Sequence, residues 1–214
     1  MTLRLIRGPF LISVAITLLR LGGELAHLSD RWFQRATGGI FPSGVGFILG
    51  ISWLPALFGP YFLDRLREKL GAAPETRVLL LGGLGAAFVL SCNRFLLPLV
   101  PLGFPRILLA VWAAMAAGAA LQAAGWLPLF RTLLAYALAS RAVVAVVMLL
   151  AMIGNWGTHY DYFGMPAEFQ MPLMPRFLWL AFFPQLVFWV GFTVILGSLS
   201  AGLYGVATAR RRNP

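Results

Sequence analysis

Six long apolar segments run through this sequence, and they constrain its fold more than any other feature. Each has about the length that a helix needs to cross the hydrocarbon core of a bilayer, about 20 residues. Backbone hydrogen bonds must be satisfied within such a segment, which makes each segment a helix. The sequence therefore predicts an all-α integral membrane protein, a bundle of about six transmembrane helices that forms one domain over residues 1–214. The segments are 8–28, 40–63, 78–100, 105–126, 129–153 and 177–206.

The scarcity of charge agrees with this class of fold. Charged residues make up 11% of the chain and the mean hydropathy is +0.83, whereas a soluble domain carries about 25% charged residues. The net charge of +10 is spread over short clusters between apolar segments, which is how topology signals are placed. We therefore expect a lipid bilayer, and no nucleic acid, as the partner of these basic residues. Cys92 is the only cysteine, which excludes an intrachain disulfide and a cysteine zinc site.

The distribution of basic residues predicts the topology. With six spans, both termini, the 64–77 loop and the 126–131 turn share one side of the membrane. That side carries ten basic residues: Arg4, Arg7, Arg65, Arg67, Lys69, Arg77, Arg131, Arg210, Arg211 and Arg212. The opposite side carries four: Arg31, Arg35, Arg106 and Arg176. The excess of positive charge places both termini in the cytoplasm, in a plasma or inner membrane.

Two of the segments have features of their own. The uninterrupted apolar stretch 8–19 resembles the core of a signal peptide, but it is followed by Arg20 and Glu24 rather than by a small-residue cleavage site. We therefore expect a retained first helix. Prolines should bend the second and the last helix, because proline lacks the backbone N–H that a helix needs. They are Pro42, Pro55, Pro60 and Pro184.

The most specific pattern is a polar stripe on the first segment. Its members recur at alternating spacings of three and four, which keeps them on one face of a helix. Charged groups at depth in a bilayer cost several kcal/mol, so this face should point toward other helices or a water-filled cavity. The stripe consists of Ser13, Thr17, Arg20, Glu24, His27, Arg31 and Gln34.

Depth along the helices suggests partners for this stripe. At about 1.5 Å per residue, Glu24 and Arg94 each lie about 24 Å from the start of their segments, and Asn93 is next to Arg94. Arg141 and Arg20 each lie twelve residues into theirs. Two arginines at one depth repel unless an anion lies between them. Glu24 is expected to pair with Arg94, and a ligand carboxylate or phosphate would serve another arginine.

The sequence GNWGTHYDYFG follows the fifth segment, at the start of an expected outer loop over 154–176. It contains His159 and Asp161, and the expected topology puts both on the same face of the membrane as His27. If the first and fifth helices are neighbours, these three groups cover a polar funnel lined by Arg20, Glu24, Arg94 and Arg141. In the alternative interpretation the outer groups are solvated and each inner arginine makes one structural bond.

These residues favour the binding or transport of a small anionic or amphiphilic solute through an outward-facing polar pocket. Arg94 and Arg141 would contact the anion, Glu24 would balance charge, and His27 and His159 would respond to protons, because histidine titrates near neutrality.

Two other functions stay open at this point. A metal-dependent membrane enzyme would use Glu24, His27, His159 and Asp161 as ligands, since Glu and His three residues apart on a helix can share one ion. A structural subunit of a larger membrane complex would need membrane-protein partners and no chemistry of its own. The sequence names no cofactor and no catalytic residue.

Overall fold

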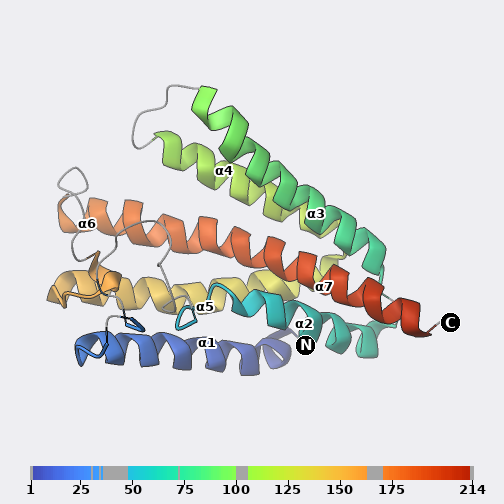
Figure 1. Cartoon of the computed structure of the whole chain (residues 1–214), viewed down its shortest axis with the longest axis horizontal. Coiled ribbons are helices and arrows are strands. Elements are labelled where there is room, and N and C mark those ends of the chain that lie inside the picture. The colour runs from blue at the N-terminus through green and yellow to red at the C-terminus, as the bar shows by residue number, and fades with distance from the viewer. Residues whose placement is uncertain are drawn as a thin grey trace. The chain divides into compact units, whose positions relative to one another are not determined.

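The computed structural model describes residues 2–29, 31–33, 35, 48–71, 73–99, 106–162 and 171–212 (Figure 1). Within these ranges 85% of the residues are helical and none is in a strand. The prediction of an all-α fold is confirmed. The α-helices are α1 (Thr2–Leu25), α2 (Leu54–Leu70), α3 (Glu75–Ser91), α4 (Arg106–Ala120), α5 (Leu127–Gly154), α6 (Leu173–Arg176) and α7 (Val190–Arg212).

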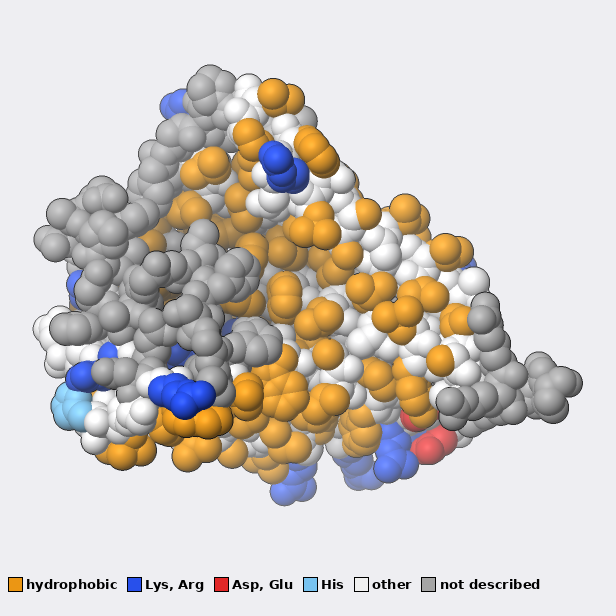
Figure 2. Space-filling model, in the orientation of Figure 1, with side chains coloured by type: hydrophobic (Ala, Val, Ile, Leu, Met, Phe, Trp, Pro, Cys, Tyr) orange, Lys and Arg blue, Asp and Glu red, His pale blue; other side chains and the backbone are white. Residues whose placement is uncertain are grey.

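Five helices of the described residues are long and apolar enough to cross a membrane. Short 3-10 or π-helical stretches extend α3 and α4 and join α6 to α7. Hydrophobic side chains are spread over the visible face of the protein (Figure 2), as on a surface in contact with lipid. These five helices correspond to the first, third, fourth, fifth and sixth apolar segments. They are Thr2–Leu25, Glu75–Leu99, Arg106–Ala124, Leu127–Gly154 and Leu173–Ala209.

The second apolar segment differs from its expected boundaries. The helix begins at Leu54 rather than near residue 40 and continues to Leu70, so the expected loop starts seven residues late. The charged residues at its end stabilise the extension, because Arg67 pairs with Asp64 and Arg65 with Glu68, each three residues apart on the helix. Residues 36–47 lie outside the described part of the chain, and the sixth span stays a prediction.

The last long helix changes its hydrogen-bond pattern around Pro184. α6 leads into a π-helical stretch at Phe177–Phe182, a second one covers Pro184–Trp189, and regular α-helix resumes with α7. The proline ring cannot donate a backbone hydrogen bond, and wider π turns around it accommodate that loss. The bend expected at Pro184 stays a prediction, and the local change is the pair of π-helical stretches on either side of Phe183.

The chain forms two compact units. The first unit comprises Met1–Arg7, Leu54–Leu138 and Val187–Pro214, and the second comprises Gly8–Trp53 and Ala139–Leu186. α1 and α5 each contribute residues to both units.

Glycines set the packing in the first unit, where α7 contacts α2 and α3. A Cβ added at Gly202 would lie 2.5 Å from the Cα of Leu79, and one at Gly59 would lie 2.2 Å from the carbonyl oxygen of Gly197. The helix backbones therefore touch with no room for a methyl group, the kind of approach that small residues allow between helices in lipid.

Candidate functional site

The polar stripe of α1 is buried in the second unit. Ser13, Thr17, Arg20 and Glu24 each expose 6% of their surface or less. The two hydroxyls donate within the helix, Ser13 Oγ to the carbonyl oxygen of Pro9 and Thr17 Oγ1 to that of Ser13. The prediction that this face points away from lipid is confirmed for these four residues.

The stripe ends with the helix. α1 stops at Leu25, His27 has a φ of 50°, and both His27 and Arg31 are exposed. Arg35 donates to Nδ1 of His27. Residues spaced three and four apart lie on one face only within a helix. His27 and Arg31 follow the end of α1, so this spacing does not place them inside the protein. Gln34 lies outside the described residues.

Glu24 joins α1 to the segment after α5. Nε of Arg20 donates to its Oε1 at 2.9 Å, and the backbone N–H of His159 donates to its Oε2 at 2.9 Å. Nδ1 of His159 also lies 2.5 Å from Oε1, an ion-pair contact in which the ring nitrogen is not aligned for a hydrogen bond. Both carboxylate oxygens are therefore engaged. The expectation that His159 faces the α1 stripe agrees with this geometry.

The expected pairing of Glu24 with Arg94 is wrong. Arg94 is exposed in a π-helical stretch at Cys92–Leu96, and its guanidinium lies 5.7 Å from the ring centroid of Phe95. Asn93, also exposed, donates to the backbone of Val89 at 2.8 Å. Depth along a helix does not tell which face a residue occupies, and Arg20, one turn away on the same helix, is the closer partner.

A short turn holds His159 in place. Its neighbour Asp161 accepts hydrogen bonds from the backbone N–H groups of Gly157 and Thr158, at 2.9 and 2.6 Å, and from Oγ1 of Thr158 at 2.9 Å. Asp161 therefore caps its own 3-10 turn, which aims the N–H of His159 at Glu24. The carboxylate thus positions His159, and its expected role as a ligand group stays a prediction.

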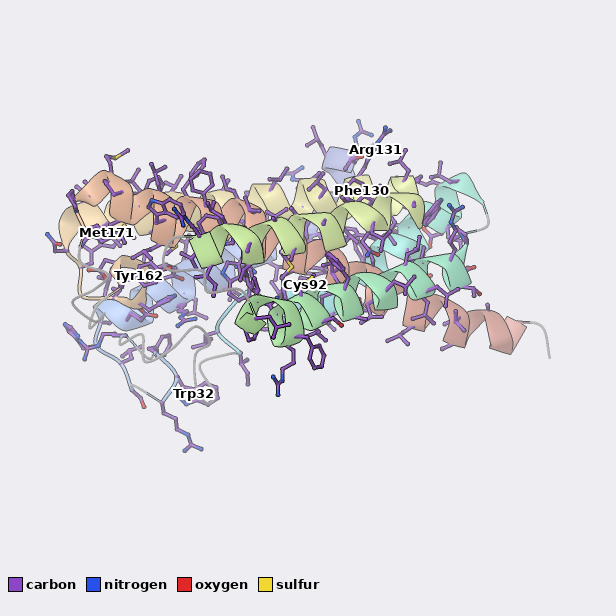
Figure 3. The ribbon with its side chains drawn as sticks, turned by 90° about the horizontal axis from the view of Figure 1, so that it is seen from above. Trp32, Cys92, Phe130, Arg131, Tyr162 and Met171 are labelled. Atoms are coloured by element: carbon purple, nitrogen blue, oxygen red, sulfur yellow. The ribbon has the colours of Figure 1, made fainter. Side chains whose placement is uncertain are left out.

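Tyrosines fix the same segment to the helices. Tyr160 is buried and its hydroxyl donates to the carbonyl oxygen of Thr17 at 3.2 Å. The hydroxyl of Tyr162 donates to the carbonyl oxygen of Leu180. Tyr162 lies at the same end of the helices as Met171 (Figure 3). Burial raises the pKa of both tyrosines, so each keeps the hydroxyl proton that it donates.

Arg141 is the second buried arginine of this unit. Its Nη1 donates to Oε1 of Gln185 at 3.4 Å and its Nη2 donates to Oγ of Ser52 at 3.2 Å. The charges of Arg20 and Arg141 both act on Tyr160, where they oppose the effect of burial on its pKa. Both arginines are therefore close enough to Tyr160 to influence it, and the equal depth expected for them stays a prediction.

Sequence reasoning missed Gln185 and Ser52. Gln185 is a buried amide in the middle of the last apolar helix, and its Nε2 contacts Sδ of Met148 at 3.5 Å. An isolated amide in such a helix is a signal in its own right, because a polar group at that depth needs a partner. No comparable sequence pattern marks Ser52 as a polar group that needs a partner. We call six residues of the second unit the polar cluster: Arg20, Glu24, Arg141, His159, Tyr160 and Gln185.

Surrounding groups lower the pKa of His159 below its ordinary value of 6.5. Desolvation is the largest cause, although the side chain keeps 23% of its exposure, and the charge of Arg20 acts in the same direction. Glu24 and Asp161 oppose the shift. The imidazole is therefore neutral at pH 7 and gains a proton less readily than a solvated histidine.

The four residues considered as metal ligands do not come together as a set. In the part of the chain that the structure describes, no three side chains of His, Cys, Asp or Glu are placed to hold a metal ion. His27 instead accepts from Arg35, and Asp161 caps its own turn.

No family model matches the sequence, and no curated protein or solved structure is significantly similar to it.

Proposed function

We propose that this is a multi-pass membrane protein, with both termini in the cytoplasm, that binds or transports a small anionic or amphiphilic solute at the polar cluster. The observation that carries this proposal is the burial of two arginines, Arg20 and Arg141, in helices long and apolar enough to span a membrane. Ionisable groups at such depth are costly and usually mark a solute or ion path.

The two arginines have different surroundings, which gives them different roles. Arg20 is held by Glu24 at 2.9 Å and balances its charge. Two of the hydrogen bonds of Arg141 end on neutral oxygens, at 3.2 and 3.4 Å. A carboxylate or phosphate group would replace them with shorter, charge-assisted bonds, which are about twice as strong. In this proposal Arg141 is the anion contact because it is buried in a helix that suits a membrane, and Gln185 and Ser52 position its guanidinium.

The test uses matched anionic and neutral amphiphiles. Purified protein in detergent is heated with medium-chain carboxylates, alkyl phosphates or the alcohols of equal chain length. A ligand that binds only the folded state raises its melting temperature. We expect the two anionic series to do so, and we expect Arg141→Gln to abolish the shift. The control Arg131→Gln removes an exposed positive charge in the other unit and should leave the shift unchanged.

The outcomes separate binding from its alternatives. Equal shifts with the alcohols would show an apolar site without anion recognition. No shift with any compound would reject the proposal. If binding is found, flux of the same anion into proteoliposomes decides between a carrier and a binding protein.

The contacts of Glu24 favour a second candidate function, that of a structural subunit that binds no ligand. Both oxygens of Glu24 are engaged by groups of the protein itself, as expected of an internal cross-link. In that case substitutions in the cluster lower stability and nothing else. The protein should then co-purify in fixed ratio with another membrane protein after mild solubilisation.

A further inference from the structure

Basic residues gather at one end of the first unit, where α2 ends, α3 begins and α7 ends. These three helix ends are tied together by short contacts. The hydroxyl of Tyr204 on α7 donates to Oδ2 of Asp64 on α2 at 2.6 Å, and Gly205 packs against the side chain of Glu75 on α3. Nη1 of Arg67 donates to Oε1 of Glu75 at 3.2 Å. The charges at these helix ends therefore lie on one small region of the protein.

The acidic residues of this region are used internally. Arg67 pairs with both Asp64 and Glu75, and its side chain is only 12% exposed. Glu68 pairs with Arg65 on the surface. The three carboxylates thus pair with Arg65 and Arg67, and no ion pair among the described residues joins one of them to another basic residue of the region.

The remaining cations face outward. Leu5 and Ile6 near the start of α1 and Leu129 near the start of α5 belong to the same core cluster of the first unit as Leu66 of α2. Arg131 projects away from the helices (Figure 3). Exposed basic side chains that pair with no acidic residue of the described ranges are Arg4, Arg7, Lys69, Arg77 and Arg131.

We call this region the basic end. Among the side chains that the structure describes, it holds seven basic and three acidic residues, a surplus of four positive charges. Basic side chains and the acidic ones beside them are visible where α2 ends (Figure 2). The basic residues are Arg4, Arg7, Arg65, Arg67, Lys69, Arg77 and Arg131, and the acidic residues are Asp64, Glu68 and Glu75.

Exposed leucines lie directly beside these cations. Leu70 follows Lys69, Leu80 is one helical turn from Arg77, and Leu127 is one turn from Arg131. A free phosphate ion would use the cations alone. A phospholipid presents a negative headgroup and an apolar chain a few ångströms apart, which is the pattern that the cations and leucines complement.

We propose that the basic end binds the headgroups of anionic phospholipids. Each Lys or Arg near an anionic membrane surface contributes about 1 kcal/mol, and clusters of four to eight such residues beside a membrane helix are typical of this recognition. The binding is independent of the polar cluster, which lies in the other unit.

The test compares two variants of equal charge. Lys69→Gln/Arg77→Gln removes two cations from the basic end, and Arg31→Gln/Arg106→Gln removes two exposed arginines elsewhere. Purified protein in neutral detergent is titrated with short-chain phosphatidylglycerol or phosphatidylcholine, and bound lipid is counted by native mass spectrometry. Phosphatidylglycerol should bind more tightly, by a margin that falls as salt is added. The first variant should lose about fivefold in affinity for each cation removed, and the second should match the wild type.

Four results would overturn the proposal. Equal binding of the two lipids would show that the site does not distinguish headgroup charge. An equal loss in both variants would show a general effect of net charge. Competition by glycerol phosphate at the lipid concentration would identify a free anion as the ligand, and tighter binding of a short RNA than of the lipid would identify a nucleic acid.

Discussion

Glu24 is the residue on which the polar cluster depends. It is nearly fully buried, it holds Arg20 in its own helix, it accepts from the backbone N–H of His159, and it lies 2.5 Å from the ring nitrogen Nδ1 of that residue. Its position inside the protein could be predicted from the spacing of polar residues on α1. Its partners could not, because His159 follows it by 135 positions and reaches it through a turn that no periodic pattern announces.

Replacing Glu24 with glutamine should destabilise the protein by about 3–5 kcal/mol, since Arg20 would be left as a buried charge without its counter-ion. The double variant Arg20→Gln/Glu24→Gln should recover part of that loss, because neither charge then remains. The free energy of unfolding in denaturant measures both. Glu68→Gln, at a surface pair with 60% of the carboxylate side chain exposed, should change stability by less than about 1 kcal/mol. Strict additivity of the two cluster substitutions would contradict the pairing.

The lowered pKa of His159 predicts how stability depends on pH. The unfolded chain takes up a proton near pH 6.5 and the folded protein only at a lower pH. Between these two values the unfolded state binds more protons, so stability rises with pH there. The contribution of His159 is complete above pH 6.5 and is lost as the pH falls toward the pKa of the folded protein.

Melting temperatures measured between pH 5 and 8 (the range in which a histidine changes charge) should therefore fall toward the acid end. His159→Gln should flatten that part of the profile, while His27→Gln, an exposed histidine, should not. The groups that act on His159 are Arg20 and Glu24 from α1 and Asp161 from its own turn. A wild-type profile that rises toward acid pH would contradict the sign.

At the scale of the elements, the lengths of the apolar segments predicted most of the long helices. The fifth segment was expected at 129–153 and α5 runs from Leu127 to Gly154. The second segment was the exception, because α2 continues through Asp64, Arg65, Arg67 and Glu68. Hydropathy marks where a chain is apolar, whereas a helix ends where its hydrogen bonds end, and charged pairs three residues apart extend it beyond the apolar stretch.

The contact between α7 and α3 predicts a sharp difference between two glycines. Gly202→Ala would place a methyl group 2.5 Å from the Cα of Leu79, and backbone cannot move aside as a side chain can. We expect a loss of about 1–3 kcal/mol in unfolding free energy, the usual cost of overpacking. Gly83→Ala on α3 meets nothing within 4 Å and should be neutral or stabilising by up to about 1 kcal/mol. Equal effects at the two sites would mean that the helices do not approach as described.

At the scale of the whole molecule, the expected topology combines two observations. The structure supplies five helices that suit a membrane, and the bias of positive charge predicts the direction in which they run. The sixth span, over the second apolar segment, is the part of this topology that rests on the sequence.

Cysteine labelling tests this topology in a Cys92→Ser background. An impermeant maleimide added to intact cells should modify Ser29→Cys, just beyond α1, and should modify Glu68→Cys at the end of α2 only after the membrane is opened. Both positions are exposed in the structure, so access depends on the side of the membrane alone. The reverse pattern would invert the topology, and labelling of both in intact cells would mean that the segment between them does not cross.

The hydrogen bond from the amide of residue 159 to Glu24 changes how mutational scans of this segment should be read. Alanine, glutamine and every other replacement but one retain the amide hydrogen, so a tolerant side-chain scan would not show that the turn is dispensable. Proline alone removes it. Thr158 is already extended, with φ −110° and ψ 171°, and residue 159 opens a 3-10 turn, a backbone setting that proline accepts without strain. His159→Pro compared with His159→Ala thus isolates a main-chain interaction by ordinary mutagenesis.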